Sequence, residues 1–194
     1  MLRPASTPSA RQTELLEAGY RYVLSHGLAD LSLRPLATAI GSSPRVLLYL
    51  FGSKDGLIRE LLARARVDEL ALLDALRHEC GGQPAGLRAV GERIWYWLSA
   101  EERRALLTLW MEGYALSLVD PDGPWADFAR TTVHDWMELL ASAQPPDERS
   151  GSDAEAQRTL VLAVLRGALM DLLATGETDR VTRAVRHQLA SMPD

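Results

Sequence analysis

Apolar residues recur along this chain at intervals of three and four residues, from about residue 10 to the end. This spacing places them on one face of an α-helix, and no segment shows the strict alternation of a half-buried strand. Turn residues and capping signals divide the pattern into nine predicted helices, over about residues 10–26, 33–40, 44–51, 53–79, 85–98, 100–119, 124–143, 152–175 and 178–191. The sequence therefore predicts an all-α protein.

Serine residues stand at many of the predicted helix N-termini. Ser32, Ser43 and Ser53 can each accept a hydrogen bond from the free backbone N–H groups of the helix that follows. Three further serines have Glu or Gln three residues later, which is the capping-box spacing: Ser9 with Gln12, Ser99 with Glu102, and Ser152 with Glu155. Gly123–Pro124 predicts the start of the seventh helix, because Pro is favoured at the first helical position.

The segment 32–54 is the most specific part of the pattern. It predicts a short helix that ends at Gly41, a residue that readily adopts the left-handed conformation. Pro44 then occupies the first position of a second helix, which is only two turns long and must be supported by its neighbours. A supported short helix after a helix and a glycine turn is typical of the helix-turn-helix, whose second helix enters the major groove of DNA.

Charge is distributed unevenly along the chain. The whole sequence has a formal net charge of −5, which by itself argues against a nucleic-acid binder. Residues 1–66, however, contain nine Lys or Arg and five Asp or Glu, whereas residues 67–194 contain 12 and 21. The positive part of the chain includes the helix-turn-helix pattern, so any contact with phosphate is expected there.

Five side chains in and around the short helix are candidates for DNA contact. Arg34 and Arg45 can reach a guanine edge or a phosphate, and Tyr49 can donate its hydroxyl to phosphate. Ser43 and the free N–H groups at the start of the short helix can bind a phosphate oxygen. Lys54 can hold the DNA backbone from the start of the next helix. Each of them can also be an ordinary solvated side chain.

Large aromatic residues concentrate in the middle of the chain. All five tryptophans lie between residues 95 and 136, and none lies in the helix-turn-helix segment. Aromatic walls with a few polar groups suit an apolar or aromatic small molecule, although aromatic residues at helical spacing also form ordinary cores. The residues expected to line such a pocket are Trp97, Trp110, Met111, Tyr114, Phe128, Thr132 and Trp136.

Residues 160–173 are apolar nearly all round, so this helix must be covered on both sides. The rest of the same chain can cover one side and a second copy of the chain the other. A central helix buried within a monomer is the alternative. The residues expected at a dimer interface are Leu162, Leu165, Arg166, Leu169, Leu173 and, on the last helix, Val185.

Catalytic, metal and membrane signals are weak. The four histidines are scattered, and a single cysteine, Cys80, provides no disulfide framework within one chain. No glycine-rich phosphate loop follows a strand and no nucleophile elbow is present, so we expect no enzyme, no metal and no cofactor. The N-terminus lacks the apolar region of a signal peptide and the longest apolar stretch is too short to cross a bilayer. We therefore expect a cytoplasmic protein.

Residues from about 11 to 62, and most strongly Ser43-Pro44 and Phe51-Gly52-Ser53-Lys54, resemble the N-terminal domain of the TetR family of bacterial transcriptional regulators. The resemblance implies an all-helical homodimer, usually a repressor, whose larger C-terminal domain binds a small ligand. Relatives usually have Tyr-x-His-Phe where this chain has Leu48-Tyr49-Leu50-Phe51, so Leu48 stands at the usual phosphate-contacting tyrosine and Leu50 is expected to pack inward. The implied DNA-contacting positions are Arg34, Ser43, Pro44, Arg45, Val46, Tyr49 and Lys54.

The expected organisation is a disordered arm over 1–8, a helix-turn-helix domain over 9–53, and a ligand-binding and dimerisation domain over 54–194, with helix 53–79 connecting the two. The expected function is a ligand-responsive regulator, a homodimer that binds a near-palindromic DNA operator and is released by a small apolar or aromatic molecule. Two alternatives stay open: a helical small-molecule-binding or partner-binding protein with weakened or lost DNA binding, and a helical enzyme that uses the aromatic cavity.

Overall fold

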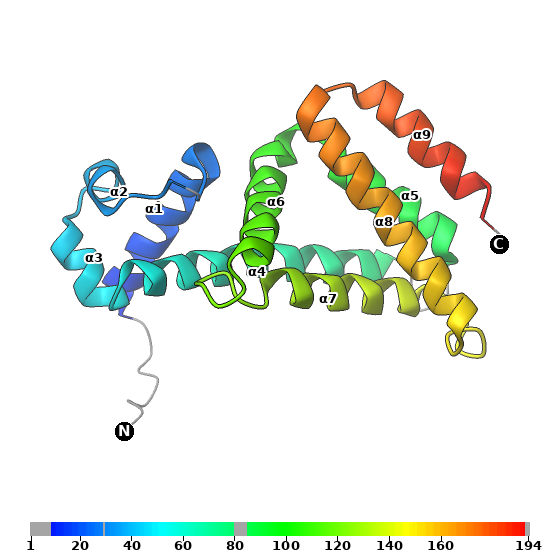
Figure 1. Cartoon of the computed structure of the whole chain (residues 1–194), viewed down its shortest axis with the longest axis horizontal. Coiled ribbons are helices and arrows are strands. Elements are labelled where there is room, and N and C mark those ends of the chain that lie inside the picture. The colour runs from blue at the N-terminus through cyan, green and yellow to red at the C-terminus, as the bar shows by residue number, and fades with distance from the viewer. Residues whose placement is uncertain (1–8, 29, 80–84, 193–194) are drawn as a thin grey trace.

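The computed structural model of this chain describes residues 9–28, 30–79 and 85–192. In these residues the ordered elements are nine α-helices and one short 3-10 helix, and no strand is present (Figure 1). The elements are α1 (Ala10–His26), α2 (Leu33–Ala39), α3 (Pro44–Phe51), α4 (Lys54–Glu79), α5 (Leu87–Leu98), η1 (Glu101–Arg103), α6 (Arg104–Val119), α7 (Phe128–Ser142), α8 (Ser152–Thr175) and α9 (Thr178–Ala190). The all-α fold predicted from the sequence is confirmed, while the expected arm over 1–8 lies outside the described residues.

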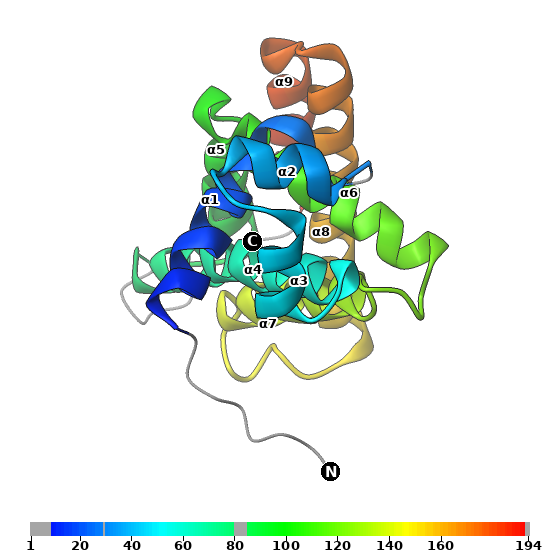
Figure 2. The same ribbon diagram turned by 90° about the vertical axis from the view of Figure 1, so that its left-hand side faces the viewer.

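The three N-terminal helices gather at one end of the molecule, and the long helix α4 runs from that end through the rest (Figure 1). Helix α7 lies along α4, and α6 stands between the N-terminal helices and the group formed by α5, α8 and α9. Figure 2 shows the N-terminal end face-on, with α2 and α3 nearest the viewer. Helix α1 packs against both α4 and α6, so the N-terminal helices contact the larger part of the chain at two places.

Three of the predicted serine caps are present. The Ser9 hydroxyl accepts a hydrogen bond from Gln12 N at 3.2 Å, and the Ser43 hydroxyl accepts one from Val46 N at 3.3 Å. Ser53 caps α4 in the same way, through the N–H of Gly56 at 2.9 Å. These bonds satisfy backbone donors that have no partner inside their own helices, so the sequence located these helix starts correctly.

The other three serine caps do not form as predicted, although Ser32 does hold the N-cap position of α2. Ser32 precedes α2 but makes no side-chain cap bond, and Ser152 lies inside α8, where Gly151 holds the cap position. Ser99 has helical backbone angles (φ −86°, ψ −2°) and ends α5 instead of opening the next helix. A capping side chain needs an extended backbone to reach the N–H groups ahead of it, and the Ser99 hydroxyl instead donates back to Tyr96 O at 3.3 Å.

Helix α7 also begins later than predicted, at Phe128 and not at Pro124. Residues 121–127 form successive turns in which the Trp125 side chain is buried. Asp127 then takes a left-handed conformation (φ 65°) immediately before the helix. Burial of the large Trp125 ring therefore fixes this connection, and the helix signal of the proline is overridden.

A polar cluster joins α1 to α4. The Tyr20 hydroxyl donates to Asp68 at 2.7 Å, and Arg64 donates to Glu17 and to Asp68, each at 2.6 Å. The Arg64 guanidinium also lies over the Tyr20 ring, 4.7 Å from its centroid. Burial raises the pKa of Tyr20 above its ordinary value, and the hydrogen bond to Asp68 raises it further. The cluster fixes how the N-terminal helices sit on the long helix.

Candidate functional sites

Helix α3 has one buried face and one exposed face. Leu47 and Phe51 are buried against the neighbouring helices, and Leu50 packs partly against the same core. Leu50 is therefore a packing residue, as predicted. Apart from Pro44, the remaining positions lie on the other side of the helix and are exposed: Arg45, Val46, Leu48 and Tyr49.

The side chains of this outer face are available to a partner. Tyr49 is 85% exposed, whereas Leu48 is 41% exposed and adds an apolar patch beside it. Pro44 is partly buried at the start of the helix. Tyr49 can thus carry the phosphate contact that the Leu48 side chain cannot make, because a phenol donates a hydrogen bond and a leucine does not. An apolar side chain in the major groove can still contact a thymine methyl group.

Three cations surround α3 without internal partners. Arg34 on α2, Arg45 on α3 and Lys54 at the start of α4 are all exposed, and none forms an ion pair with any described residue. Ser43 uses its oxygen as a helix cap, which leaves its O–H free to donate. The structure therefore leaves the polar side chains predicted for DNA contact accessible on α2, on α3 and at the start of α4.

A small cavity of about 50 Å³ lies between helices of the larger part of the molecule. It is bounded by side chains from five helices, α4 to α8. Six of the seven residues predicted to line a pocket do line it: Trp110, Met111, Tyr114, Phe128, Thr132 and Trp136. Trp97 does not. Its ring stacks on Trp110 with centroids 5.8 Å apart, and Arg103 covers it, so Trp97 supports the wall from behind.

Glu69 is a cavity residue that the sequence reading missed. Its side chain is 1% exposed, with one carboxylate oxygen accepting from Trp136 Nε1 at 2.8 Å and the other bonded to Arg66. Arg66 also pairs with Asp135. The available signal was the apolar stripe of the long helix, where Glu69 stands at helical spacing between Ala65 and Leu72. A charge inside such a stripe is buried and must find partners.

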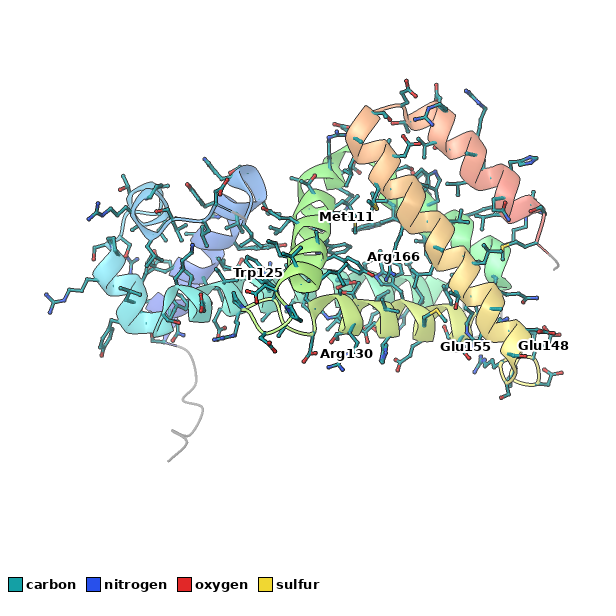
Figure 3. The ribbon with its side chains drawn as sticks, in the orientation of Figure 1. Met111, Trp125, Arg130, Glu148, Glu155 and Arg166 are labelled. Carbon is teal, nitrogen blue, oxygen red and sulfur yellow. The ribbon has the colours of Figure 1, made fainter. Side chains whose placement is uncertain are left out.

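Arg166 also faces this cavity and not the outside of α8. Its Nη1 donates to the Tyr114 hydroxyl at 3.3 Å, and its guanidinium lies 5.0 Å from the centroid of the Tyr114 ring. Burial lowers the pKa of Arg166 from its ordinary value, although a guanidinium stays charged in proteins. Figure 3 shows Arg166 on α8 and Met111 on α6 at the space between these two helices.

The other residues predicted for a dimer interface also lie largely inside one protomer. Leu162, Leu165 and Leu169 line the cavity, Val185 is buried, and Leu173 is partly buried beside α6. Side chains that a single chain already covers cannot form its outer contact surface. The exposed apolar stripe of α8 is a different set, at alternating four- and three-residue spacing: Ala156, Leu160, Ala163, Gly167, Met170 and Ala174.

An open groove of about 1250 Å³ lies outside the cavity, between the end of α1, helix α6 and helix α8. Met111 and Tyr114 line both the groove and the cavity, so these two side chains form the wall between them. The next residue on α6, Glu112, accepts a hydrogen bond from Leu28 N at 2.7 Å, just after α1. Two successive residues of α6 therefore have different roles: Met111 lines the cavity, and Glu112 contacts the N-terminal part of the chain.

Within the described residues, no group of three or more His, Cys, Asp or Glu side chains is placed to hold a metal ion. None of the described helices combines the length and the apolar character needed to cross a membrane.

Solved structures with the same architecture match nearly the whole chain. A transcriptional regulator from Rhodococcus sp. Rha1 matches with a TM-score of 0.72 at 21% identity, over 92% of this chain and 94% of its own. A TetR transcription regulator from Haloarcula marismortui matches with a TM-score of 0.67 at 20% identity, over 93% and 94%. The multidrug binding protein EbrR complexed with imidazole matches with a TM-score of 0.67 at 23% identity, over 100% and 98%.

No protein-family model and no curated protein matches the sequence. The structural similarity shows that the chain has the fold of TetR-family regulators, which is the fold that residues 11–62 predicted.

Proposed function

We propose that this chain is a ligand-responsive transcriptional regulator that binds DNA as a homodimer. The observation that carries the proposal is the position of Arg34, Arg45 and Lys54, which lie exposed and without ion-pair partners in the described residues around a short, supported helix. Exposed cations around such a helix supply phosphate contacts, and Arg45 and Tyr49 lie on the outer face, where base edges and phosphates are reached. The TetR-type fold supports the same conclusion.

Two copies of the chain provide the two reading heads that a near-palindromic site requires. Adjacent major grooves on one face of DNA are roughly 34–36 Å apart, so the dimer has to hold its heads at that spacing. The stripe on α8 defined above is the surface we propose for the contact between copies. Its small residues permit close approach of two helices, and Leu160 and Met170 (46% and 62% exposed) supply apolar area.

A small molecule in the cavity alters DNA binding through α6 in this account. The Met111 and Tyr114 side chains must move to enlarge a cavity of about 50 Å³, because a pocket of that size holds only a few water molecules. Both side chains belong to the helix that bonds to Leu28 through Glu112. A shift of α6 would therefore change the position of the N-terminal helices. Such coupling between two sites is typically worth about 1–3 kcal/mol. Repression, with release by the ligand, is the mode that we propose.

Selection of genomic DNA tests the proposed function. Fragments of the source genome are incubated with the purified chain at low salt, the bound fraction is sequenced, and the enriched fragments are tested by mobility shift. We expect a two-fold symmetric motif and a loss of enrichment in Arg45→Ala. The matched control is Arg88→Ala, which removes an exposed arginine of α5 that pairs with Glu92. If the wild-type chain, Arg45→Ala and Arg88→Ala all retain DNA fragments equally weakly and without a common motif, the proposal is contradicted.

One alternative function has a specific observation behind it. Leu48 is exposed on the outer face of α3, where a polar DNA contact was expected from the resemblance. A chain that has lost operator binding but keeps the cavity would be a small-molecule-binding or partner-binding protein. That alternative predicts no enriched DNA motif together with intact ligand binding, so the same selection separates it from the main proposal. The enzyme alternative predicts turnover of a compound that binds in the cavity.

A further inference from the structure

Three buried polar atoms around the cavity lack hydrogen-bond partners. They are Trp110 Nε1 on α6, Thr132 Oγ1 on α7 and Arg166 Nη2 on α8. In the described residues the other such atoms are Ser42 Oγ and Asp135 Oδ2, and the second of these pairs with Arg66. Most of the buried polar atoms that have no partner therefore belong to residues that line this one cavity. The Trp110 side chain is 6% exposed, which leaves its N–H no route to bulk water. An unsatisfied buried polar group is costly, and three of them on residues that line one cavity, from three helices, indicate a site built for a polar partner.

The missing partner has to accept hydrogen bonds. An indole N–H and a guanidinium N–H can only donate, and a threonine hydroxyl can either donate or accept. The cavity-lining acceptor Glu69 already accepts from Trp136 and Arg66, and it accepts no hydrogen bond from any of the three atoms. A ligand that brings its own acceptor oxygens satisfies all three atoms.

The charge of the missing partner follows from the ion pairs. Arg66 is neutralised by two carboxylates, those of Glu69 and Asp135. Arg166 has no carboxylate within ion-pair distance among the described residues, and its one hydrogen bond goes to the Tyr114 hydroxyl. Glu69, which lines the same cavity, attracts the partly buried Arg166 from a distance but forms no ion pair with it. An anion that reaches Nη2 would make a direct charge-assisted hydrogen bond, which is stronger than the bond to a neutral acceptor.

The remaining surface of the cavity is apolar and aromatic. Phe128, Leu162 and Leu165 line it, and Met111 separates it from the outer groove. A flexible methionine can change rotamer and so admit a ring or a short chain. The space available without such a change, about 50 Å³, accommodates little more than a carboxylate head.

We propose that the cavity binds a small aromatic or aliphatic carboxylic acid, whose carboxylate accepts hydrogen bonds from Arg166 Nη2 and Trp110 Nε1, with Thr132 as a further donor. Its apolar body lies toward Met111. That this acid is the effector of DNA binding rests on the proposed function. Binding of the acid to the cavity does not, because it involves no contact with DNA.

Calorimetry on the full chain without DNA tests the ligand class. The probes are benzoate, phenylacetate and 3-phenylpropionate, each compared with the amide and the primary amine of the same carbon frame. We expect at least one acid to bind tenfold or more tightly than its amide and its amine. If no acid of the series exceeds its two matched compounds, including the case in which none binds, the proposal is overturned.

Two variants test the donors. Arg166→Met should weaken binding of the preferred acid by roughly ten- to a hundredfold and binding of its amide by much less, because the ion pair is lost and the shape is kept. Arg166→Lys should restore part of the affinity. The matched control is Arg130→Met, which makes the same substitution at an arginine whose side chain is 69% exposed on the outer side of α7 (Figure 3). An equal effect of the two Met variants on the acid overturns the proposal.

Trp110→Phe replaces the indole by a smaller phenyl ring, so the side chain stays aromatic but loses its N–H donor. This variant provides an independent readout if Arg166→Met does not fold. We expect about a fivefold loss of affinity for the acid and less than a twofold change for the amine; equal losses for both overturn the role of Trp110. DNA mobility shifts are measured separately with the same proteins. For the wild-type chain, DNA binding without a preference for any acid rejects the carboxylate and keeps the proposed function. A clear preference for an acid without DNA binding rejects the proposed function and keeps the carboxylate.

Discussion

The outer face of α3 and the cavity between α4 and α8 both hold an arginine without a carboxylate partner, but in opposite surroundings. Arg45 is exposed, so water satisfies its donors at no cost until DNA replaces that water. Arg166 is turned inward, and one of its nitrogens has neither a protein partner nor contact with solvent. The exposed Arg45 is stable with or without a bound partner, whereas Arg166 is stabilised when a partner accepts its remaining hydrogen bond. An unpaired arginine therefore indicates a binding site more strongly when it is buried than when it is exposed.

The largest expected effect comes from Gly56→Ala, which should damage the α3 end and spare the cavity. A Cβ at Gly56 would collide with the backbone carbonyl oxygen of Phe51, the last residue of α3, so the turn between α3 and α4 would have to shift. We expect a loss of about 2–4 kcal/mol in unfolding free energy. Urea unfolding measures it, and mobility shift should show lost DNA binding.

The control for Gly56→Ala is Gly113→Ala on α6, where the new Cβ would meet only side chains, those of Leu62 and Phe128 at 3.2–3.3 Å. These side chains can yield by a few tenths of an ångström, so the loss should be smaller. If Gly113→Ala destabilises the chain more than Gly56→Ala, the contrast between the rigid turn and the adaptable interior is wrong.

Arg45→Ala should have the next largest effect, and only on DNA. Arginine contacts to guanine or phosphate are typically worth about 1–3 kcal/mol, so operator affinity should fall roughly ten- to a hundredfold. The melting temperature and carboxylate binding should stay unchanged, because Arg45 is exposed and makes no ion pair within the described residues. Fluorescence anisotropy on a labelled operator gives the affinity. A matching loss of stability would show that Arg45 holds the fold and does not read DNA.

Glu112→Ala tests the contact between the two regions. The Leu28 N–H would lose its acceptor, and an unsatisfied, part-buried donor costs about 1–2 kcal/mol. Glu138→Ala, which removes an exposed carboxylate of α7, should change the unfolding free energy by less than about 0.5 kcal/mol. Urea unfolding curves of both variants decide this. Indistinguishable curves would mean that α6 does not hold the N-terminal helices through Glu112.

The effect that is smallest at neutral pH concerns Tyr20, because it appears only at high pH. Its pKa is raised in the folded state, so below its ordinary pKa of about 10 the tyrosine is neutral in both folded and unfolded chains and stability is unaffected. Above that value the unfolded chain loses this proton first, and stability falls by up to about 1.4 kcal/mol per pH unit. Tyr20→Phe should remove this part of the slope between pH 10 and 11.5, whereas Tyr96→Phe, at an exposed residue, should not.

The sequence located the caps and turns around α3 more accurately than it separated the buried from the exposed residues of α8. Helix caps and glycine turns are local signals, so Ser43, Pro44 and Gly41 could be assigned from their neighbours alone. Six of the seven residues predicted to line a pocket also line the cavity, because large aromatic residues at helical spacing face inward together. Trp97 also stands at helical spacing, but it lies behind Trp110 and does not line the cavity. Sequence spacing alone does not distinguish these two positions.

Helix α8 shows what spacing cannot decide. A helix that is apolar on all sides gives no preferred face, so the largest side chains were assigned to the partner when they fill the chain's own core. The exposed face consists instead of small residues with Leu160 and Met170. Glu69 and Arg166 could not be placed either, because the direction of a buried charge depends on partners from other helices.

The most direct test of the account is the paired selection of genomic DNA by the wild-type chain and by Arg45→Ala. The account predicts that the wild-type chain enriches a two-fold symmetric motif with half-sites one helical turn or a multiple apart, and that Arg45→Ala loses this enrichment while remaining folded. Equal enrichment by the two proteins, or no motif with the wild-type chain at low salt, would contradict the assignment of α3 as the DNA-reading helix.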